Sequence, residues 1–85
     1  MAEVSMYSSD FCAYCQRAEQ FLHRKGVTTI EKIAVEFDPR AREAMIARTG
    51  RRTVPQIYVG TVHVGGYHDL ITLDRAGRLD KMLSG

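Results

Sequence analysis

The chain has 85 residues, 45% hydrophobic and 26% charged, with a formal net charge of +2. This length predicts one domain, residues 1–85, and the composition is that of an ordinary soluble protein. The weak positive charge gives no reason to expect nucleic acid as a partner. No apolar run reaches membrane-spanning length and residues 1–3 do not resemble a signal peptide, so we expect a cytoplasmic protein without a membrane partner.

The first part of the chain predicts a strand, a helix and a second strand. A short apolar stretch predicts a strand over residues 3–8. Apolar residues at helical spacing then predict a helix over residues 13–25, which Gly26 ends. Residues 28–35 are rich in β-branched and apolar side chains and predict the second strand. A single helical crossover of this kind favours a parallel pair of strands.

The second part predicts a helix, a hairpin and a final helix. Asp38 as N-cap and Pro39 at the first helical position predict a helix that ends near Thr49. The remaining elements are predicted as strands at 56–59 and 62–64 around a two-residue turn, a helix opened by residues 67–69 and divided near Gly77, and a last helical piece at 79–83. The order predicts an α/β fold, a mixed four-stranded sheet flanked by helices on both faces.

The only two cysteines, Cys12 and Cys15, lie where the first strand gives way to the first helix. A helix N-terminus offers unpaired N–H groups and a partial positive charge, which stabilise a thiolate. We therefore expect Cys12 to lie exposed near the N-cap as the nucleophile. Cys15 should lie one turn further in, more buried, ready to attack a disulfide formed on Cys12. A C-x-x-C pair at such a junction is typical of redox chemistry.

Other interpretations of the pair are a structural disulfide, a zinc site and two idle thiols. A disulfide that closes so small a loop would constrain the unfolded chain little. Structural zinc takes about four ligands, but the chain has no second C-x-x-C, and His63 and His68 straddle two glycines. We predict no resident metal site, with Cys12 as the ligand if an iron–sulfur cluster is bound.

Three segments together resemble the glutaredoxins, redox proteins of the thioredoxin fold. Residues 12–15, Cys-Ala-Tyr-Cys, resemble the family's Cys-Pro-Tyr-Cys. Residues 53–55 match its Thr-Val-Pro, in which the proline is cis, and residues 65–69 resemble its Gly-Gly-x-x-Asp. All three occur in the family's order and spacing, and the resemblance covers essentially the whole chain.

The resemblance implies a glutathione-dependent thiol–disulfide oxidoreductase, with Cys12 as nucleophile, Cys15 as resolving thiol and glutathione as reductant. Its substrates would be disulfide-containing or glutathionylated proteins, and the chain would act as a monomer. The implied glutathione-binding residues are Tyr14, Thr53, Val54, Pro55, Gly66, Tyr67, His68 and Asp69.

Two of these segments have implied roles and plainer alternatives. The resemblance implies that Val54, turned outward by a cis Pro55, pairs with the main chain of glutathione. It also implies that the helix start holds the γ-glutamyl carboxylate through the backbone of His68 and the side chain or backbone of Asp69. The alternatives are a trans Pro55 that merely starts a strand and an Asp69 that caps an ordinary strand-to-helix turn. Arg48 or Arg52 is a further candidate for the glycyl carboxylate.

The chain departs from the family pattern at three places. Ala13 replaces the motif proline, which adds an N–H donor and predicts a shifted redox potential. Residues 8–11 lack the lysine that many members carry there, and Asp10 disfavours a nearby thiolate. His68 stands where an acidic or small hydroxyl residue is common.

Two other functions stay open. In family members, a small residue in place of the motif proline is associated with a [2Fe–2S] cluster, held by two chains and two glutathiones as a carrier or sensor. A redoxin reduced by thioredoxin reductase is the third possibility, which the segments at 53–55 and 65–69 disfavour.

Overall fold

The computed structural model describes residues 2–85. Its elements in chain order are β1 (Val4–Ser8), α1 (Ala13–Arg24), β2 (Ile30–Ala34), α2 (Pro39–Thr49), β3 (Gln56–Val59), β4 (Val62–Gly65), α3 (Tyr67–Arg75) and α4 (Leu79–Ser84). The four strands form one sheet in the order β2-β1-β3-β4. β1 and β2 are parallel, whereas β3 runs antiparallel to both of its neighbours. The predicted mixed sheet is confirmed.

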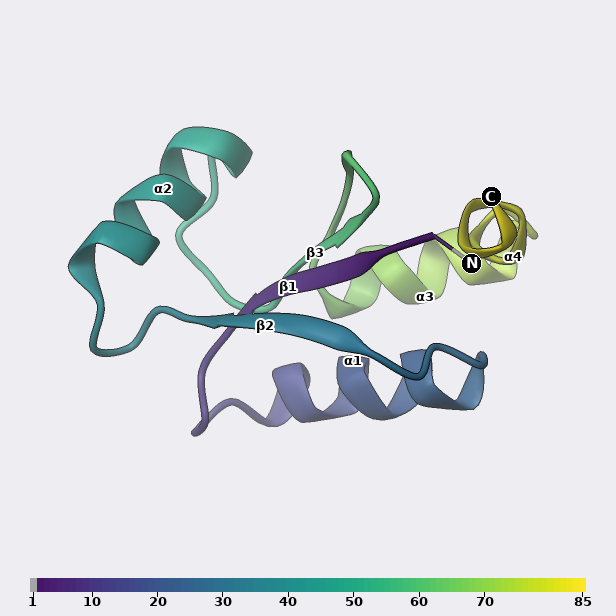
Figure 1. Ribbon diagram of the computed structural model, residues 1–85, viewed down its shortest axis with the longest axis horizontal. Coiled ribbons are helices and arrows are strands. Elements are labelled where there is room, and N and C mark those ends of the chain that lie inside the picture. The colour runs from purple at the N-terminus through teal and green to yellow at the C-terminus, as the bar shows by residue number, and fades with distance from the viewer. Residues whose placement is uncertain (1) are drawn as a thin grey trace.

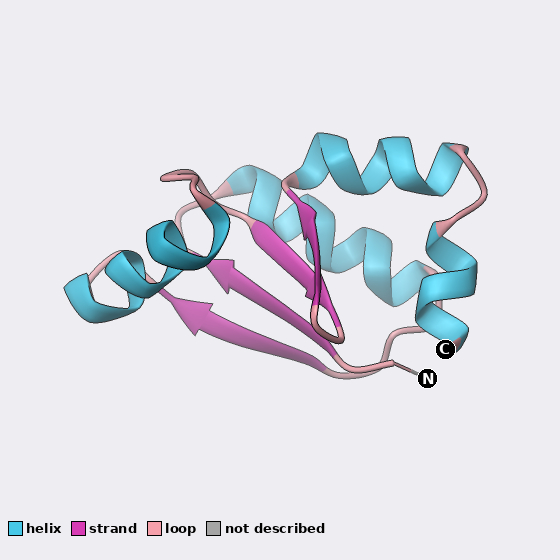
Figure 2. Cartoon of the chain, turned by 90° about the horizontal axis from the view of Figure 1, so that it is seen from above, coloured by secondary structure: helices cyan, strands magenta, loops and turns pink. Residues whose placement is uncertain are grey.

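Helices cover both faces of the sheet, as predicted. Figures 1 and 2 show α1 and α3 on one face and α2 on the other. On the face of α1 and α3, Met6 and Ile57 pack in one buried cluster with Leu22 and Leu70. Burying each such side chain contributes about 1.5–3 kcal/mol, so this cluster holds α1 and α3 against the sheet.

The opposite face carries a smaller core under α2. Tyr7 of β1 and Tyr58 of β3 pack with Met45 of α2. The two tyrosine rings meet edge to face, with centroids 6.4 Å apart. Arg48 lies over Tyr58, with its guanidinium carbon 4.1 Å from the ring centroid, and donates a hydrogen bond to the Tyr7 hydroxyl at 3.0 Å. α2 is therefore held by stacked aromatic and guanidinium groups as well as by apolar contacts.

The element boundaries differ from the predictions by a few residues. β2 covers Ile30–Ala34 rather than 28–35 because it pairs with the five residues of β1 and extends no further. α1 ends at Arg24, and β4 continues to Gly65. The predicted division near Gly77 is confirmed, since this glycine has φ +74° between α3 and α4.

The two ends of the described chain lie together. The Ala2 N–H donates to the Leu83 carbonyl at 2.8 Å, and Figure 1 shows α4 beside the N-terminus. Both lie at the end of the sheet opposite the first turn of α1. Among residues 2–85, no helix is long and apolar enough to cross a membrane.

Candidate active site

Cys12 occupies the N-cap of α1. Its backbone is extended, with φ −116° and ψ 111°, and its Sγ accepts the Cys15 N–H at 3.1 Å. The sulfur thus takes the place that a serine or aspartate oxygen has at other N-caps. This N–H and the partial positive charge of the helix end both favour a thiolate. The predicted N-cap position is confirmed, but Cys12 is half-buried rather than exposed, with its Sγ 3.7 Å from the Val54 carbonyl.

Cys15 lies one turn into α1 and is only 3% exposed. Burial raises the pKa of the Cys15 thiol to about 12, and its hydrogen bond with Cys12 acts in the same direction. At neutral pH this group is therefore a thiol. Both cysteines are free. The pair is asymmetric in the predicted sense, with one thiol at the helix end and the other protonated beneath it.

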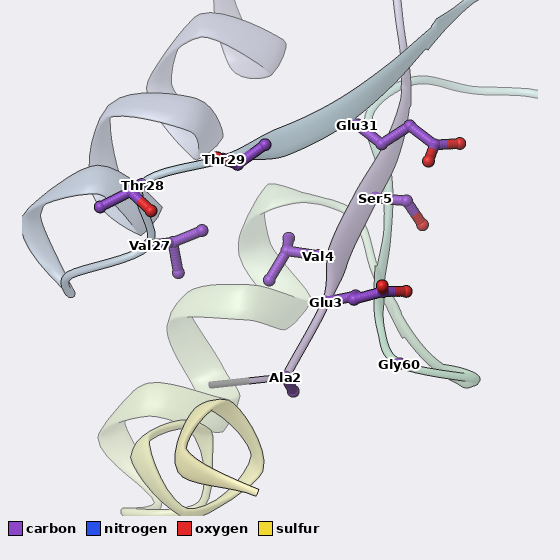
Figure 3. A pocket seen from close by; sticks show the side chains of 9 residues that line it. All are labelled: Ala2, Glu3, Val4, Ser5, Val27, Thr28, Thr29, Glu31 and Gly60. Atoms are coloured by element: carbon purple, nitrogen blue, oxygen red, sulfur yellow. The ribbon is translucent and has the colours of Figure 1, made fainter.

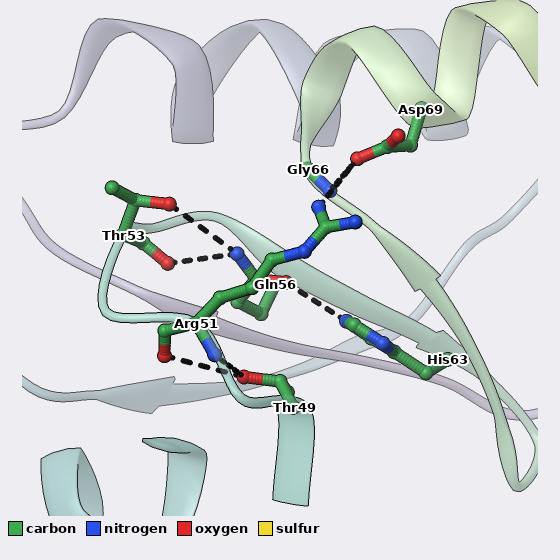
Figure 4. Close-up of polar contacts among 7 residues, drawn as sticks. All are labelled: Thr49, Arg51, Thr53, Gln56, His63, Gly66 and Asp69. Carbon is green, nitrogen blue, oxygen red and sulfur yellow. Dashed lines mark hydrogen bonds and ion pairs between the residues drawn. The ribbon is translucent and has the colours of Figure 1, made fainter.

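Residues 53–55 bring the second segment to Cys12. The Val54–Pro55 peptide bond is cis, which confirms what the resemblance implied. The Thr53 carbonyl accepts from the Gln56 side-chain amide at 2.9 Å, and Gln56 in turn meets His63 of β4 (Figure 4). The contact of His63 with Gln56 follows from the β3–β4 register, which the sequence does not show.

The start of α3 is the third segment. Gly66 is the N-cap and has no side chain to bond the first N–H groups of the helix. The Asp69 carboxylate instead accepts from the Gly66 N–H at 2.9 Å and from the Arg51 guanidinium at 2.7 Å. The guanidinium, and then the Gly66 N–H, lower the pKa of Asp69. An ionised carboxylate repels another, so the backbone N–H groups, not the Asp69 side chain, are suited to a carboxylate ligand.

Of the two glycines before α3, only Gly65 is required by the local geometry. Gly65 has φ +114°, and a Cβ placed on it would lie 2.8 Å from the Cγ of Asp69. Gly66 has φ −86°, and a Cβ there would meet the Pro55 carbonyl at an ordinary 3.5 Å. Asp69 can therefore reach back to Gly66 only because residue 65 lacks a side chain.

Tyr14 joins the two helix starts. Its ring centroid lies 5.8 Å from that of Tyr67 and 5.4 Å from that of His68. The guanidinium of Arg17 lies 5.3 Å from the Tyr14 centroid. This aromatic group forms a partly exposed surface between α1 and α3. The structure thus brings all three predicted segments together around Cys12.

The remaining candidates lie differently. The Arg48 guanidinium contacts Tyr7 and Tyr58 between α2 and the sheet. It is therefore not free to bind a glycyl carboxylate, the role considered for it from the sequence. Arg52 is exposed, and its carbonyl accepts from Arg42. Before Cys12, where the family lysine is missing, Ser9 Oγ and the Asp10 N–H donate to Glu36 at 2.7 and 3.1 Å. These bonds link the loop before Cys12 to the segment that follows β2.

A cleft of about 550 Å³ lies away from the cysteines, at the start of β1. Glu3, Ser5 and Glu31 line one side of it, and residues 27–29 line the other (Figure 3). It contains no thiol or imidazole, so its size does not make it the reactive site. Within residues 2–85, no group of three or more His, Cys, Asp or Glu side chains could hold a metal ion.

The fold and the paired thiols define the class of protein. A mixed four-stranded sheet with helices on both faces, and a C-x-x-C pair at the start of α1, is a thioredoxin-like fold. A family model described as glutaredoxin matches residues 4–64. A glutaredoxin of Pseudomonas aeruginosa is 46% identical over 84 residues, which cover 99% of each chain. The chain belongs to the glutaredoxin family, whose members are generally thiol oxidoreductases.

Two solved structures bear on the site. A buckwheat glutaredoxin in complex with glutathione superposes with a TM-score of 0.86 at 30% identity, covering 98% of this chain and 77% of that one. A structure described as metal binding of glutaredoxins has a TM-score of 0.73 at 43% identity, covering 98% of this chain and 89% of that one.

Proposed function

We propose that the chain is a glutathione-dependent thiol–disulfide oxidoreductase that reduces glutathione mixed disulfides and protein disulfides. The observation that carries the proposal is the meeting of three segments at Cys12. These are the first turn of α1, the backbone at Thr53 and Val54, and the start of α3, whose N-cap Gly66 has no side chain. The glutathione complex of the buckwheat relative supports the choice of ligand.

The reduction of a mixed disulfide needs only Cys12. Its thiolate attacks the glutathione sulfur, the substrate's sulfur leaves as a thiolate and takes up a proton, and glutathione stays bonded to Cys12. The thiolate of a second glutathione then attacks the sulfur of the bound one. This step releases the Cys12 thiolate and forms oxidised glutathione from the substrate's own glutathionyl group and one free glutathione, which is the reductant consumed in the cycle.

A protein disulfide needs Cys15 as well. Cys12 attacks one sulfur of the substrate, and Cys15 then loses its proton and attacks Cys12, which releases the reduced protein and leaves a Cys12–Cys15 disulfide. Two glutathiones restore the thiols. The high pKa of Cys15 keeps it protonated until a mixed disulfide forms beside it, so it does not compete for substrate.

The site offers complementary groups to each part of glutathione. The backbone at Val54 would pair with the tripeptide main chain as an added strand. The N–H groups of Tyr67, His68 and Asp69 would hold the γ-glutamyl carboxylate. The ionised Asp69 side chain would accept from the ammonium group beside that carboxylate. Tyr14 would cover the sulfur region.

A glutathione-coupled assay with glutathionylated peptide and with a protein disulfide tests the function. We expect turnover of both substrates with glutathione as the reductant, and none with thioredoxin reductase alone. An Asp69→Ala variant should raise KM for the glutathionylated peptide about tenfold or more, the effect of losing a charged hydrogen bond. A parent protein that is reduced by thioredoxin reductase and not by glutathione would refute the proposal.

Cluster binding is a second candidate, favoured by one arrangement. Cys15 is buried, so Cys12 alone is accessible to a cluster, and the chain would supply one of about four ligands. A second copy and two glutathiones would supply the others. Anaerobic reconstitution with iron, sulfide and glutathione, followed by a visible spectrum and a measurement of mass in solution, tests this candidate. A colourless monomer would exclude it.

The setting of this activity is also a proposal. Two thiols that must be returned to the reduced state suit a reducing compartment such as the cytoplasm. We propose that the chain works there as a monomer on disulfide-containing or glutathionylated proteins. A dimer is expected only with a bound cluster.

A further inference from the structure

A line of hydrogen bonds runs from β4 to the peptide group before Val54. His63 Nε2 lies 2.8 Å from Gln56 Oε1, and Gln56 Nε2 lies 2.9 Å from the Thr53 carbonyl and 3.5 Å from its hydroxyl (Figure 4). Gln56 is only 1% exposed, so water has little access to replace either partner. The position of this amide therefore depends on His63 and Thr53.

The chemistry of the groups fixes the direction of the line. A carbonyl can only accept, so the nitrogen end of the Gln56 amide must face Thr53. Its oxygen end then faces His63, and an amide oxygen also only accepts. His63 must carry its proton on Nε2. Replacing this histidine by a ring without a donor leaves a buried oxygen unpaired.

The surroundings of His63 hold it in this state. Its ring centroid lies 5.1 Å from that of Tyr58, which fixes the plane of the imidazole. Burial, and then the positive charge of Arg51, lower the pKa of His63, Asp69 opposes them, and Arg48 adds a smaller lowering. The ring is therefore neutral at neutral pH.

The far end of the line is part of the candidate site. The Thr53 carbonyl and the Val54 N–H belong to one peptide group, and the Val54 carbonyl lies 3.7 Å from the Cys12 sulfur. Thr53 is itself exposed. On its other side, Arg51 ties the same segment to α3 through Asp69. The buried Gln56 side chain thus bonds the backbone of the Thr53–Val54 strip from the protein interior.

We propose that His63, acting through Gln56, is a positioning residue that sets how tightly the Thr53–Val54 strip binds glutathione. The proposal rests on the proposed function and adds to it a residue that does not touch the ligand. His63 orients the amide, the amide holds the Thr53 carbonyl, and the strip is thereby presented to an incoming peptide backbone at a fixed place beside Cys12.

The first test is His63→Phe, which keeps a ring against Tyr58 and removes the donor. KM for a glutathionylated peptide should rise about three- to tenfold, the range that matches one neutral hydrogen bond, with kcat unchanged. His23→Phe is the matched control, since His23 Nδ1 makes a 2.7 Å contact with the Val27 carbonyl at the far end of α1. The control should lose stability without a change in KM.

The second test separates positioning from stability. His63→Phe should lower the urea midpoint, and Gln56→Met added to it should restore the midpoint, because both buried polar partners are then gone. The Gln56→Met change removes the donor to the Thr53 carbonyl, so KM should stay raised in this double variant. A KM that returns to the parent value together with the midpoint would overturn the proposal.

A third readout needs no glutathione. Hydrogen exchange of the Gln56 side-chain amide, followed by NMR, should be slow in the parent and in His23→Phe but fast in His63→Phe. Equal rates in all three would refute the positioning role even in an active enzyme. A parent without glutathione-dependent turnover would instead refute the proposed function, and the exchange rates would still show whether His63 holds the amide.

Discussion

The first turns of α1 and α3 lie close together at one end of the sheet, and they use their N–H groups differently. In α1, the Cys12 sulfur accepts the Cys15 N–H, so the helix end is closed by the reactive atom. In α3, the N-cap is Gly66, and the Asp69 carboxylate turns back to bond the Gly66 N–H. One helix end bonds its own sulfur, and the other has no N-cap side chain bonded to its first N–H groups.

Under the proposed function, this difference separates the two tasks of the site. The α1 end would hold a fixed sulfur whose negative charge is stabilised before any substrate arrives. The α3 end would hold a fixed backbone with open donors, and Asp69, bonded to Arg51, keeps that backbone in place without filling them. Variants that act on one helix start and spare the other test this division.

The largest effect is expected from Cys12→Ser. Serine is among the best N-cap residues, so α1 should keep its cap and the urea midpoint should stay close to that of the parent. The hydroxyl is too weak a nucleophile at neutral pH, and activity on both substrates should fall to the background rate. Steady-state kinetics and urea denaturation of the same preparation check both parts.

Alkylation of the parent protein tests independently whether Cys12 is the reactive thiol. Iodoacetamide at neutral pH should modify Cys12 and leave Cys15 unmodified, because Cys15 is buried and its pKa is raised to about 12. Peptide mapping identifies the modified residue. Faster modification of Cys15 would reverse the roles of the two thiols.

Cys15→Ser should have the next largest effect, restricted to one substrate. Its backbone N–H still bonds the Cys12 sulfur, so the closed end of α1 is kept. Reduction of a glutathionylated peptide should persist, whereas reduction of a protein disulfide should fall about tenfold or more, because the resolving thiol no longer acts at high effective concentration. An equal loss on both substrates would point to a structural role for Cys15.

The glycines before α3 give the next contrast. Gly65→Ala forces φ +114° on an alanine and pushes the Asp69 carboxylate away, and it should destabilise the fold by about 2 kcal/mol or more. Gly66→Ala has room and an accessible φ, so its cost should stay below about 1 kcal/mol. Urea denaturation measures both variants. Similar losses of stability in the two variants would mean that glycine is not required at position 65 to make room for the Asp69 carboxylate.

The sequence predicts the elements of the fold well because they depend on local signals. Asp38 and Pro39 open α2 as expected, and Gly77 divides the last helix. The Cys12 N-cap also follows from local sequence, as a strand gives way to a helix there. Both predicted ends of β2 are wrong, because its length is set by pairing with β1, not by its own residues.

The parts of the site that the sequence did not reveal are contacts between distant residues. Arg51 and Asp69 lie 18 positions apart, and nothing in either segment indicates their ion pair. The contact between Gln56 and His63 depends on an irregular β3–β4 register. Cys12 is half-buried, and its Sγ lies beside the carbonyl of Val54, 42 positions away. The spacing of residues within one element predicts none of these contacts. Only the family resemblance predicted that residues 53–55 and 65–69 lie near Cys12.

The smallest effect expected is the pH dependence contributed by Asp69. The pKa of this carboxyl is lowered in the folded state, first by Arg51 and then by the Gly66 N–H. A lowered pKa stabilises the fold above the unfolded pKa of about 3.9, and that stabilisation is lost as pH falls through the folded value. The side chains of Arg51 and Asp69 are 47% and 44% exposed, so solvent limits the gain to about 1 kcal/mol or less.

Asp69→Asn removes the charge and leaves an oxygen for both donors. At pH 7 it should be less stable than the parent by up to about 1 kcal/mol, and the difference should shrink steadily below about pH 4. Arg51→Met provides the reference, because in that background Asp69→Asn should change the pH dependence much less. Urea midpoints at several pH values, for all four proteins of the cycle, give the coupling directly. A difference that grows toward low pH would have the wrong sign, and Asp69 would then not be the ionised anchor of the α3 start.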